Sequence, residues 1–516
     1  MRRICLAALA ALILCLAAAV PASADYTPSG PLVADSGFRP NPDGYAFENY
    51  GGGEEKDLNA AQMVRLFGRE VCENADGRCV LTTVARGWMR SFNAVMDGGH
   101  CMGFAATASL WHSGLGEPVA PSLLGATTTF GLSKSGAVER HIAYGFAFQA
   151  LPSVQSQTRD HINARQLVAE LKRLLPDRSQ PFTLGIFKRD ETGGHAITPF
   201  ALEDRGAGRY GVLVYDNNYP GETRAMNVDV NRNTWNYQAA PNPKIKAGIY
   251  DGDGKVSHLS IMPLTPGLGE QDCFFCGAGA GAGKKKMTLA WASDPTTRRH
   301  SELVVVDRRK RVSGCADFGD GFACRNRIPG VEQENLMVGG EQNWLNRVSP
   351  SYKLPFGRPY TVLLRGADLR RPAREGIAVI APRRYVGLAD VELGPGEVDM
   401  LRIGRGMRRV IFVNDERQTE TPRLQLGLER REASYLFEVK ARRVAEGAVL
   451  GLELHPKRRV LEIEGADVRQ TGRYRVKVVR STARGNRTAR RQVTLRAGQS
   501  LEIEYGELLR KRGKRR

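Results

Sequence analysis

The clearest periodic pattern in the chain is a run of apolar residues at helical spacing between residues 163 and 175. Its apolar positions recur three and four residues apart, which places them on one face of a helix. Asn163 and Gln166 have the spacing of a capping box at the start, and Pro176 follows the end. We therefore predict an amphipathic helix whose buried face comprises Ala164, Leu167, Val168, Leu171, Leu174 and Leu175.

A second helix is predicted where almost every position is small or apolar. The run from Cys101 to Trp111 follows the glycines at 98 and 99, and its only polar side chains are Thr107 and Ser109. A helix that is apolar nearly all round lies in the middle of a domain.

Strand patterns follow these helices. Residues 181–188 form a short apolar run, and segments 195–203 and 210–216 flank the turn sequence DRGAGR, which predicts a hairpin. Residues 255–264 predict one more strand. Helices followed by a mostly antiparallel sheet indicate an α+β domain over residues 61–262.

The second half has a different pattern. Short segments such as 461–464, 474–479 and 501–505 alternate apolar and charged residues, as half-buried strands of a β-sandwich do. We therefore expect a multidomain protein in which an α+β domain precedes all-β sandwich modules. The predicted divisions are a signal peptide at 1–24, a loose leader at 25–60, the α+β domain at 61–262, a linker with a Gly/Ala spacer at 263–286, sandwich modules at 287–372 and 373–509, and a basic tail at 510–516.

The first 24 residues have the pattern of an export signal. Arg2 and Arg3 precede an Ala/Leu-rich run, and Ala22-Ser23-Ala24 supplies the small residues that signal peptidase requires. We predict cleavage after Ala24 and a secreted mature chain, extracellular or periplasmic; a membrane anchor is the competing interpretation. No later stretch approaches the roughly 20 apolar residues of a membrane-spanning helix, so no membrane span is expected.

Charge separates the two halves. Residues 1–262 carry 25 Lys+Arg and 25 Asp+Glu, so the whole net charge of +20 lies in residues 263–516. This distribution favours chemistry in the first half and attachment to an anionic surface or polymer through the second; an ordinary solvated surface is the alternative. Nucleic acid is an unlikely partner, because the cations are scattered along strands and form no known reading motif.

The cysteines predict disulfides and one remaining thiol. Of nine cysteines, Cys5 and Cys15 lie in the signal. Local spacing suggests three pairs in an oxidising compartment, which leaves Cys101 over as a reactive thiol or an intermolecular link. Zinc binding by the last four is less favoured, so no metal or cofactor is expected. The predicted pairs are Cys72–Cys79, Cys273–Cys276 and Cys315–Cys324.

Cys101 has the surroundings that a cysteine nucleophile needs. A helix start offers positive potential and backbone N–H groups, which favour the thiolate, and a histidine can take the proton. His195 opens one strand of the predicted hairpin and Asp216 ends the other, so these two side chains can meet. We predict Cys101 as nucleophile, His195 as general base and acid, and Asp216 as the group that orients the imidazole. Asn217 or Asn218 could take that third role instead, whereas His100 and His112 are poorly placed for the second.

The segments GGHCMGFA, GGHAITPFALE and YGVLVYDNN together resemble the papain-like cysteine peptidases over residues 61–262. The resemblance implies amide hydrolysis through an acyl-enzyme, with a backbone oxyanion hole at the helix start. Three features depart from the family pattern. The gap of 94 residues between Cys101 and His195 is shorter than is usual in the family. The position six residues before the cysteine, usually an oxyanion glutamine, is Val95, for which Asn93 could substitute, and Asp216 stands where asparagine is usual.

These observations favour a secreted thiol hydrolase, a cysteine peptidase or amidase, that acts on a protein or peptide substrate such as a cell-wall peptide. Two alternatives remain open at this point. One is acyl transfer by the same three residues, as in transglutaminase-like proteins. The other is an inactive papain-like scaffold that serves secreted adhesion, which the missing glutamine favours.

Overall fold

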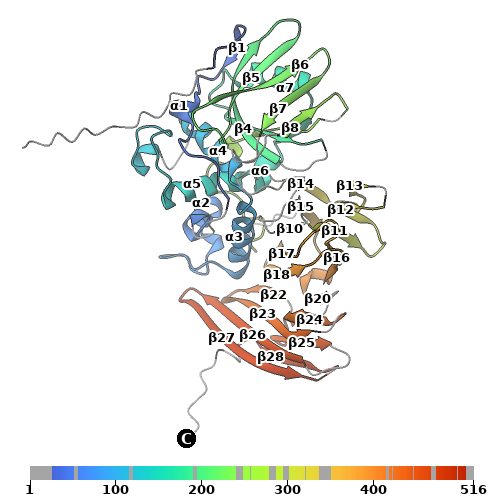
Figure 1. The fold of residues 1–516 in the computed structure, drawn as a ribbon. Coiled ribbons are helices and arrows are strands. Elements are labelled where there is room, and N and C mark those ends of the chain that lie inside the picture. The colour runs from blue at the N-terminus through green and yellow to red at the C-terminus, as the bar shows by residue number, and fades with distance from the viewer. Residues whose placement is uncertain are drawn as a thin grey trace, which may run out of the picture.

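A computed structural model describes the chain from residue 26 onward, with gaps (Figure 1). The predicted signal peptide with its cleavage site, most of the Gly/Ala spacer and the basic tail lie outside the described residues. The structure describes residues 26–51, 56–115, 120–189, 194–239, 248–255, 257–277, 286–293, 301–319, 321–335, 350–413, 418–420, 422–444, 447–466, 472–496, 498–506 and 509.

The first half contains helices and a curled antiparallel half-barrel sheet, and the second half contains two antiparallel sheets. Among the described residues, no helix has the length and apolar character needed to cross a membrane. The helices are α1 (Pro40–Asp43), α2 (Ala60–Phe67), α3 (Thr83–Met96), α4 (Cys101–His112), α5 (Gly136–Phe146), α6 (Pro152–Gln155) and α7 (Ala164–Leu174).

Both predicted helices form. At the start of α7 the Asn163 side chain accepts a hydrogen bond from the Gln166 backbone N–H, and the Gln166 side chain accepts one from the Asn163 backbone N–H. The predicted capping box is therefore confirmed. In α4 every residue from Cys101 to Leu110 is buried. An apolar surface all round lets α4 pack at the centre of the first domain, between the sheet and α5.

The half-barrel sheet has the strand order β2-β9-β3-β4-β5-β6-β7-β8, and β1 pairs with β4. The predicted hairpin is confirmed as β4 and β5, and the strand predicted at 255–264 is the shorter β9. Helix α4 packs on one face of the sheet and α7 on the other, because alternate residues of each strand point to opposite faces. The strands are β1 (Leu32–Asp35), β2 (Arg159–Ile162), β3 (Phe182–Phe187), β4 (Gly194–Asp204), β5 (Arg209–Tyr215), β6 (Thr223–Asp229), β7 (Thr234–Ala239), β8 (Gly248–Gly252) and β9 (Leu259–Pro263).

Residues 26–51 are packed into this first domain, so the prediction of a loose leader is wrong for them. Strand β1 extends the sheet, and Phe38, Tyr45 and Tyr50 are buried. The ring of Tyr45 meets that of Phe104 in α4 at 5.0 Å between centroids. The segment is rich in Pro, Gly, Asp and Asn, which favoured a loose leader, whereas its packing comes from a few aromatic side chains between them.

Residues 263–277, predicted as the start of a linker, also belong to the first domain. Cys273 and Phe275 are buried there, and the Phe275 ring stacks on Trp88 of α3 with 5.6 Å between centroids. Two adjacent phenylalanines within a short disulfide loop supply enough apolar surface to anchor the segment.

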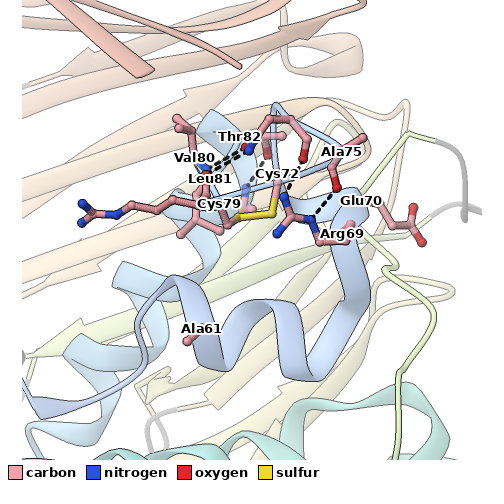
Figure 2. Close-up of a disulfide and its surroundings, with 12 residues drawn as sticks. Ala61, Arg69, Glu70, Cys72, Ala75, Cys79, Val80, Leu81 and Thr82 are labelled. Carbon is pink, nitrogen blue, oxygen red and sulfur yellow. Dashed lines mark hydrogen bonds between the residues drawn. A yellow bond between two sulfur atoms is a disulfide. The ribbon is translucent and has the colours of Figure 1, made fainter. Parts of the chain in front are cut away.

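The three predicted disulfides form, and among the described cysteines Cys101 remains a thiol. Figure 2 shows the Cys72–Cys79 disulfide, whose loop is braced by Arg69 donating to the Ala75 carbonyl oxygen at 2.9 Å. The loop also carries Glu73, which accepts hydrogen bonds from Ser434 of the second half. This disulfide therefore supports a contact between the two halves of the chain.

The second half contains one ten-stranded sheet and one nine-stranded sheet among the described residues, and a single hydrophobic core joins the two. The ten-stranded sheet has the order β14 (Glu332–Asn335), β15 (Pro350–Pro355), β10 (Lys286–Ser293), β17 (Ala373–Ala381), β18 (Arg384–Leu393), β22 (Arg423–Arg430), β23 (Ala433–Val444), β26 (Gly472–Thr482) and β27 (Gly485–Leu495), with β21 (Gln418–Glu420) beside β23. The nine-stranded sheet has the order β13 (Phe322–Asn326), β12 (Val312–Asp317), β11 (Glu302–Asp307), β16 (Tyr360–Arg365), β19 (Val398–Ile403), β20 (Arg409–Val413), β24 (Val449–His455), β25 (Val460–Ala466) and β28 (Ser500–Glu504).

The predicted division into two modules at Ala373 is wrong. Strand β17, which begins at Ala373, pairs with β10 from the first predicted module. Both sheets then continue without a break, because β18 pairs with β22 and β19 pairs with β20. Strand pairing between distant segments leaves no mark on the alternation pattern, so the pattern located strands but not their grouping.

Helix α3 docks the first domain on the ten-stranded sheet (Figure 1). Its Thr83 backbone N–H donates to the Ser434 hydroxyl at 2.8 Å, and a Cβ atom on Gly87 would come within 2.4 Å of the Tyr385 ring. Tyr385, Leu436 and Val479 of the sheet belong to the same hydrophobic cluster as α3. The two halves thus share part of one core.

Candidate active site

Helix α4 begins at Cys101, directly after a tight glycine turn. Gly99 has φ +138°, which favours glycine, and a Cβ atom on Gly51 would meet the Asp97 carbonyl oxygen at 2.3 Å. The turn is therefore both sharp and closely packed. The backbone N–H of Ala196 in β4 donates to the Cys101 Sγ atom at 3.3 Å, which places the thiol against the strand that carries His195.

His195 and Asp216 meet as predicted from the hairpin. The Nε2 atom of His195 lies 2.8 Å from the Asp216 Oδ1 atom, and both side chains are buried. The other ring nitrogen, Nδ1, has no hydrogen-bond partner of good geometry among the described residues. Because Nε2 is held by the carboxylate, Nδ1 is the nitrogen available to the thiol.

The electrostatics of the pair favour a charged imidazolium. Burial alone would lower the pKa of His195, but the charge and hydrogen bond of Asp216, together with smaller contributions from Cys101, raise that pKa to about 10. The contribution of Cys101 means that its side chain interacts with the ring. Conversely, burial would raise the pKa of Asp216, but the His195 charge and several hydrogen bonds hold it below its ordinary value.

The structure distinguishes the three neighbouring candidates for the third role. Asp216 contacts the His195 ring directly, whereas the Asn217 side chain donates to the carbonyl oxygens of Cys101 (3.2 Å) and Ala196 (2.9 Å). The Asn218 amide nitrogen lies 3.5 Å from His195 Nε2, and its backbone N–H donates to Asp216 Oδ1 at 3.0 Å. Asp216 thus has the geometry of the orienting group, and Asn217 ties the helix start to the strand.

Tyr237 is a member of this cluster that the sequence patterns did not reveal. Its hydroxyl, in β7, donates to the second carboxylate oxygen of Asp216 at 2.7 Å. The guanidinium of Arg224 in turn interacts with the Tyr237 hydroxyl. Strand β7 lies two strands from β5, which ends beside Asp216, and a tyrosine in an alternating strand gives no sequence signal of such a contact.

Neither residue considered for the oxyanion position supplies a side-chain donor beside the thiol. Val95 has no polar group and is buried in α3. The Asn93 side chain donates to the Leu58 carbonyl oxygen at 3.0 Å. The start of α4 therefore leaves backbone N–H groups as the candidate donors for an oxyanion.

The two histidines judged poorly placed serve other contacts. The His100 ring lies between the Asp57 carboxylate (2.9 Å) and the Tyr50 carbonyl oxygen (2.8 Å) and is completely buried. His112 lies near Asp43 at 3.3 Å and the Ser36 carbonyl oxygen at 3.1 Å. Both rings thus connect α4 to residues of the N-terminal segment between Ser36 and Asp57.

Comparisons of the chain with protein-family models, with curated proteins and with solved structures found no match. The site must therefore be interpreted from its own geometry. Within the described residues, no group of three His, Cys, Asp or Glu side chains is arranged to hold a metal ion.

One further residue from the N-terminal segment completes the site. Asn49 accepts a hydrogen bond from the His100 backbone N–H at 2.8 Å and donates its own N–H to the Asn217 carbonyl oxygen at 2.9 Å. Asn49 therefore connects His100, which precedes the candidate nucleophile, to Asn217, which follows Asp216. It lies in the segment that the sequence patterns predicted as a loose leader.

The site is closed in this structure. Cys101 is 0% exposed and His195 is 2% exposed, so solvent does not reach the thiol. A substrate can reach Cys101 only after the residues that cover it move. Any chemistry at this site therefore includes an opening step.

Proposed function

We propose that this protein is a secreted thiol hydrolase of papain-like fold, a cysteine peptidase or amidase. The observation that carries the proposal is the buried cluster of Cys101, His195 and Asp216, in which the carboxylate holds one imidazole nitrogen and leaves the other toward the thiol. A histidine whose pKa is raised to about 10 is protonated at neutral pH, which is the form that a thiolate–imidazolium pair requires.

Each step follows from these contacts. The Cys101 thiolate bonds to the carbonyl carbon of the substrate amide, and backbone N–H groups at the start of α4 stabilise the oxyanion. His195 gives its proton to the departing amine, and the C–N bond breaks to leave a thioester. His195 then takes a proton from water, whose oxygen attacks the thioester carbon, and the acid product leaves as the thiolate returns.

The three disulfides are compatible with secretion. We propose that residues 263–516, which carry the whole net charge of +20, attach the enzyme to an anionic surface or polymer near its peptide substrate. This arrangement would divide the work between an enzymatic first half and an adhesive second half.

The closed site favours one alternative, a papain-like scaffold without activity. Complete burial of Cys101 and the missing oxyanion side chain are what a purely structural domain would show. In that case the contacts of Asp216 would serve only to satisfy buried polar groups.

Alkylation of Cys101 by iodoacetamide across about pH 4–9, read by peptide mass spectrometry, separates the two functions. For the hydrolase we expect labelling of Cys101 that persists below pH 7 and is lost in His195→Ala. The matched control is His112→Ala, which also removes a histidine but one that faces Asp43. Labelling with an ordinary thiol profile, unchanged in His195→Ala, would support the scaffold instead.

The opening step adds a second measurement. If opening limits the reaction, the labelling rate should level off at high iodoacetamide concentration, because the reagent then reacts as fast as the thiol becomes exposed. At that plateau, N-ethylmaleimide should label Cys101 at the same rate as iodoacetamide, because the opening step and not the reagent then sets the rate.

A further inference from the structure

One face of the ten-stranded sheet changes character along its strands. In β23 and β26 the alternate residues Ser434, Leu436, Val479 and Ser481 lie against the first domain. Further along the same face the alternate positions become charged, with Glu438 and Lys440 in β23 and Lys477 and Arg475 in β26. The docked half of this face is thus apolar or small, and the half beyond the docked domain is polar.

The charged half forms a groove of about 520 Å³. Strand register sets the cations in rows across three neighbouring strands: Lys440 lies opposite Arg475, and Lys477 lies opposite Arg490. The lining residues contribute six cations and two carboxylates. They are Asp390, Arg423, Glu438, Lys440, Arg475, Val476, Lys477, Arg490, Arg491 and Gln492.

Both carboxylates form ion pairs with cations of the same lining. Asp390 contacts Arg423 at 2.6 Å and Lys440 at 3.7 Å, and Glu438 contacts Lys477 at 3.5 Å. Arg491 pairs with the buried Val476 and so lies on the other face of β27, which leaves five cations against two carboxylates on the face of the groove. Arg490 and Gln492 lie in the exposed strand β27, where solvent and ligands have access.

The spacing of the rows indicates an extended ligand. Neighbouring strands lie about 4.8 Å apart, and residues two positions apart on a strand lie about 7 Å apart. Cations on three strands and in two successive rows therefore cover an area that no single phosphate or carboxylate spans. A linear polymer with regularly repeated anionic groups fits this arrangement.

The lining also distinguishes between polymers. The ten residues around the groove, all in the described part of the chain, include no aromatic side chain. Proteins that hold single-stranded nucleic acid without sequence preference stack bases on aromatic rings, and double-stranded DNA is read by elements that enter a groove. A cationic groove without aromatic residues suits a polymer that has charged groups and no bases.

We propose that this groove binds an acidic polysaccharide, recognised through the carboxylate or phosphate groups on its sugars. The proposal deepens the attachment role proposed above by assigning it to one site, and it does not depend on whether Cys101 is catalytic. The attachment role of the second half is then assigned to this groove and not to the basic surface as a whole.

The test measures binding of the full mature chain carrying Cys101→Ala, so that turnover plays no part. The probes are polygalacturonate, phosphorylated dextran, uncharged dextran and a short oligothymidylate. We expect binding to one or both charged glycans, with a steep dependence on salt, and none to uncharged dextran. The relative affinity for the first two probes identifies the anionic group.

A pair of charge-matched variants locates the site. Arg475→Gln/Lys477→Gln/Arg490→Gln should lower the affinity at least about tenfold and flatten its salt dependence, because three counterion-releasing contacts are lost. Arg308→Gln/Arg309→Gln/Lys310→Gln removes three exposed cations from the turn between β11 and β12 and should have little effect. Equal losses in the two variants, tighter binding of oligothymidylate, or no binding of either charged glycan would each overturn the proposal. Thermal unfolding of both variants checks that the fold is intact.

Discussion

Asp216 is the residue on which the candidate site depends most. Its carboxylate accepts hydrogen bonds from the His195 ring, the Asn218 backbone and the Tyr237 hydroxyl, all without contact with solvent. A buried carboxylate with three donors remains ionised and holds its neighbours in fixed orientations. The pKa values of His195 and Asp216 therefore depend on each other.

Replacing Asp216 with asparagine should lower the pKa of His195 below its ordinary value of 6.5. The negative charge of Asp216, which raises this pKa, is then lost. Burial, which lowers it and is the largest influence, remains. Histidine NMR titration of the variant measures the change, and Asp229→Asn in β6 is the matched control. A pKa of His195 that stays near 10 in Asp216→Asn would contradict the assignment of the carboxylate as its main partner.

The same coupling predicts how stability depends on pH. In the wild type the folded state keeps a proton on His195 between pH 6.5 and about 10, whereas the unfolded state has lost it. The free energy of unfolding should therefore fall as pH rises through this window, and the fall should be absent in Asp216→Asn. Urea unfolding at several pH values gives both curves.

Tyr237→Phe tests the residue that the sequence did not reveal. Loss of its hydroxyl removes one donor from Asp216, so the pKa of Asp216 should rise and acid unfolding should begin at a higher pH. A hydrogen bond to a charged group contributes about 2 kcal/mol, which sets the expected loss of stability. Tyr210→Phe, whose hydroxyl faces Lys172, is the control. A positioning role also requires slower alkylation of Cys101 in Tyr237→Phe than in Tyr210→Phe.

At this scale the sequence predicted the residues that local patterns mark. A glycine turn before an apolar helix indicated Cys101, and the two ends of a hairpin indicated His195 and Asp216. Asn49 and Tyr237 could not be predicted in the same way, because they reach the site through the path of the N-terminal segment and the order of the strands in the sheet. Neither feature produces a periodic pattern of apolar residues from which it could be predicted.

Among the secondary-structure elements, α3 connects the candidate site in the first domain to the ten-stranded sheet of the second half. Its last turn leads into the glycines before Cys101, and its first turn binds the ten-stranded sheet. Glu429 of β22 lies at this junction, where its side chain accepts from the Val84 backbone N–H at 3.3 Å. Burial raises the pKa of Glu429 to about 7, and the charge of nearby Glu73 contributes to the rise.

Glu429→Gln should therefore stabilise the protein in mildly alkaline solution. Between pH 4.5 and about 7 the folded state holds a proton on Glu429 that the unfolded state lacks, so the free energy of unfolding falls as pH rises. The variant should avoid this fall and gain about 3 kcal/mol near pH 8, with no difference near pH 4. Urea unfolding measures this, with the exposed Glu432→Gln as control. Parallel pH curves for the wild type and Glu429→Gln would show that the carboxylate titrates normally.

Periodic elements were predicted well, and their partners were not. Helix α7 and the hairpin of β4 and β5 have patterns that depend only on neighbouring residues. The pairing of β17 with β10 joins segments about 90 residues apart and uses backbone groups that every residue possesses. That is why the predicted boundary at Ala373 failed although the strands around it formed.

For the whole molecule, the shared core means that the two halves depend on each other despite their different charges. Residues 26–277 expressed alone would expose the α3 face that Tyr385, Leu436 and Val479 cover. We expect this fragment to bind a hydrophobic dye and to self-associate, since large exposed apolar patches favour association. Size-exclusion chromatography and dye fluorescence, compared with the intact chain, measure both effects. A monomeric fragment with the unfolding midpoint of the intact chain would show that the halves are independent.

The complete burial of Cys101 has a consequence beyond catalysis. A thiolate open to an oxidising medium is converted to sulfenic acid and then to irreversible products, and it exchanges with nearby disulfides. Three other pairs of cysteines in this chain are already oxidised. In the closed structure, burial therefore shields the Cys101 sulfur from oxidants and from disulfide exchange. If the site opens as proposed, the fraction of time that it spends open sets the rate at which this sulfur is oxidised.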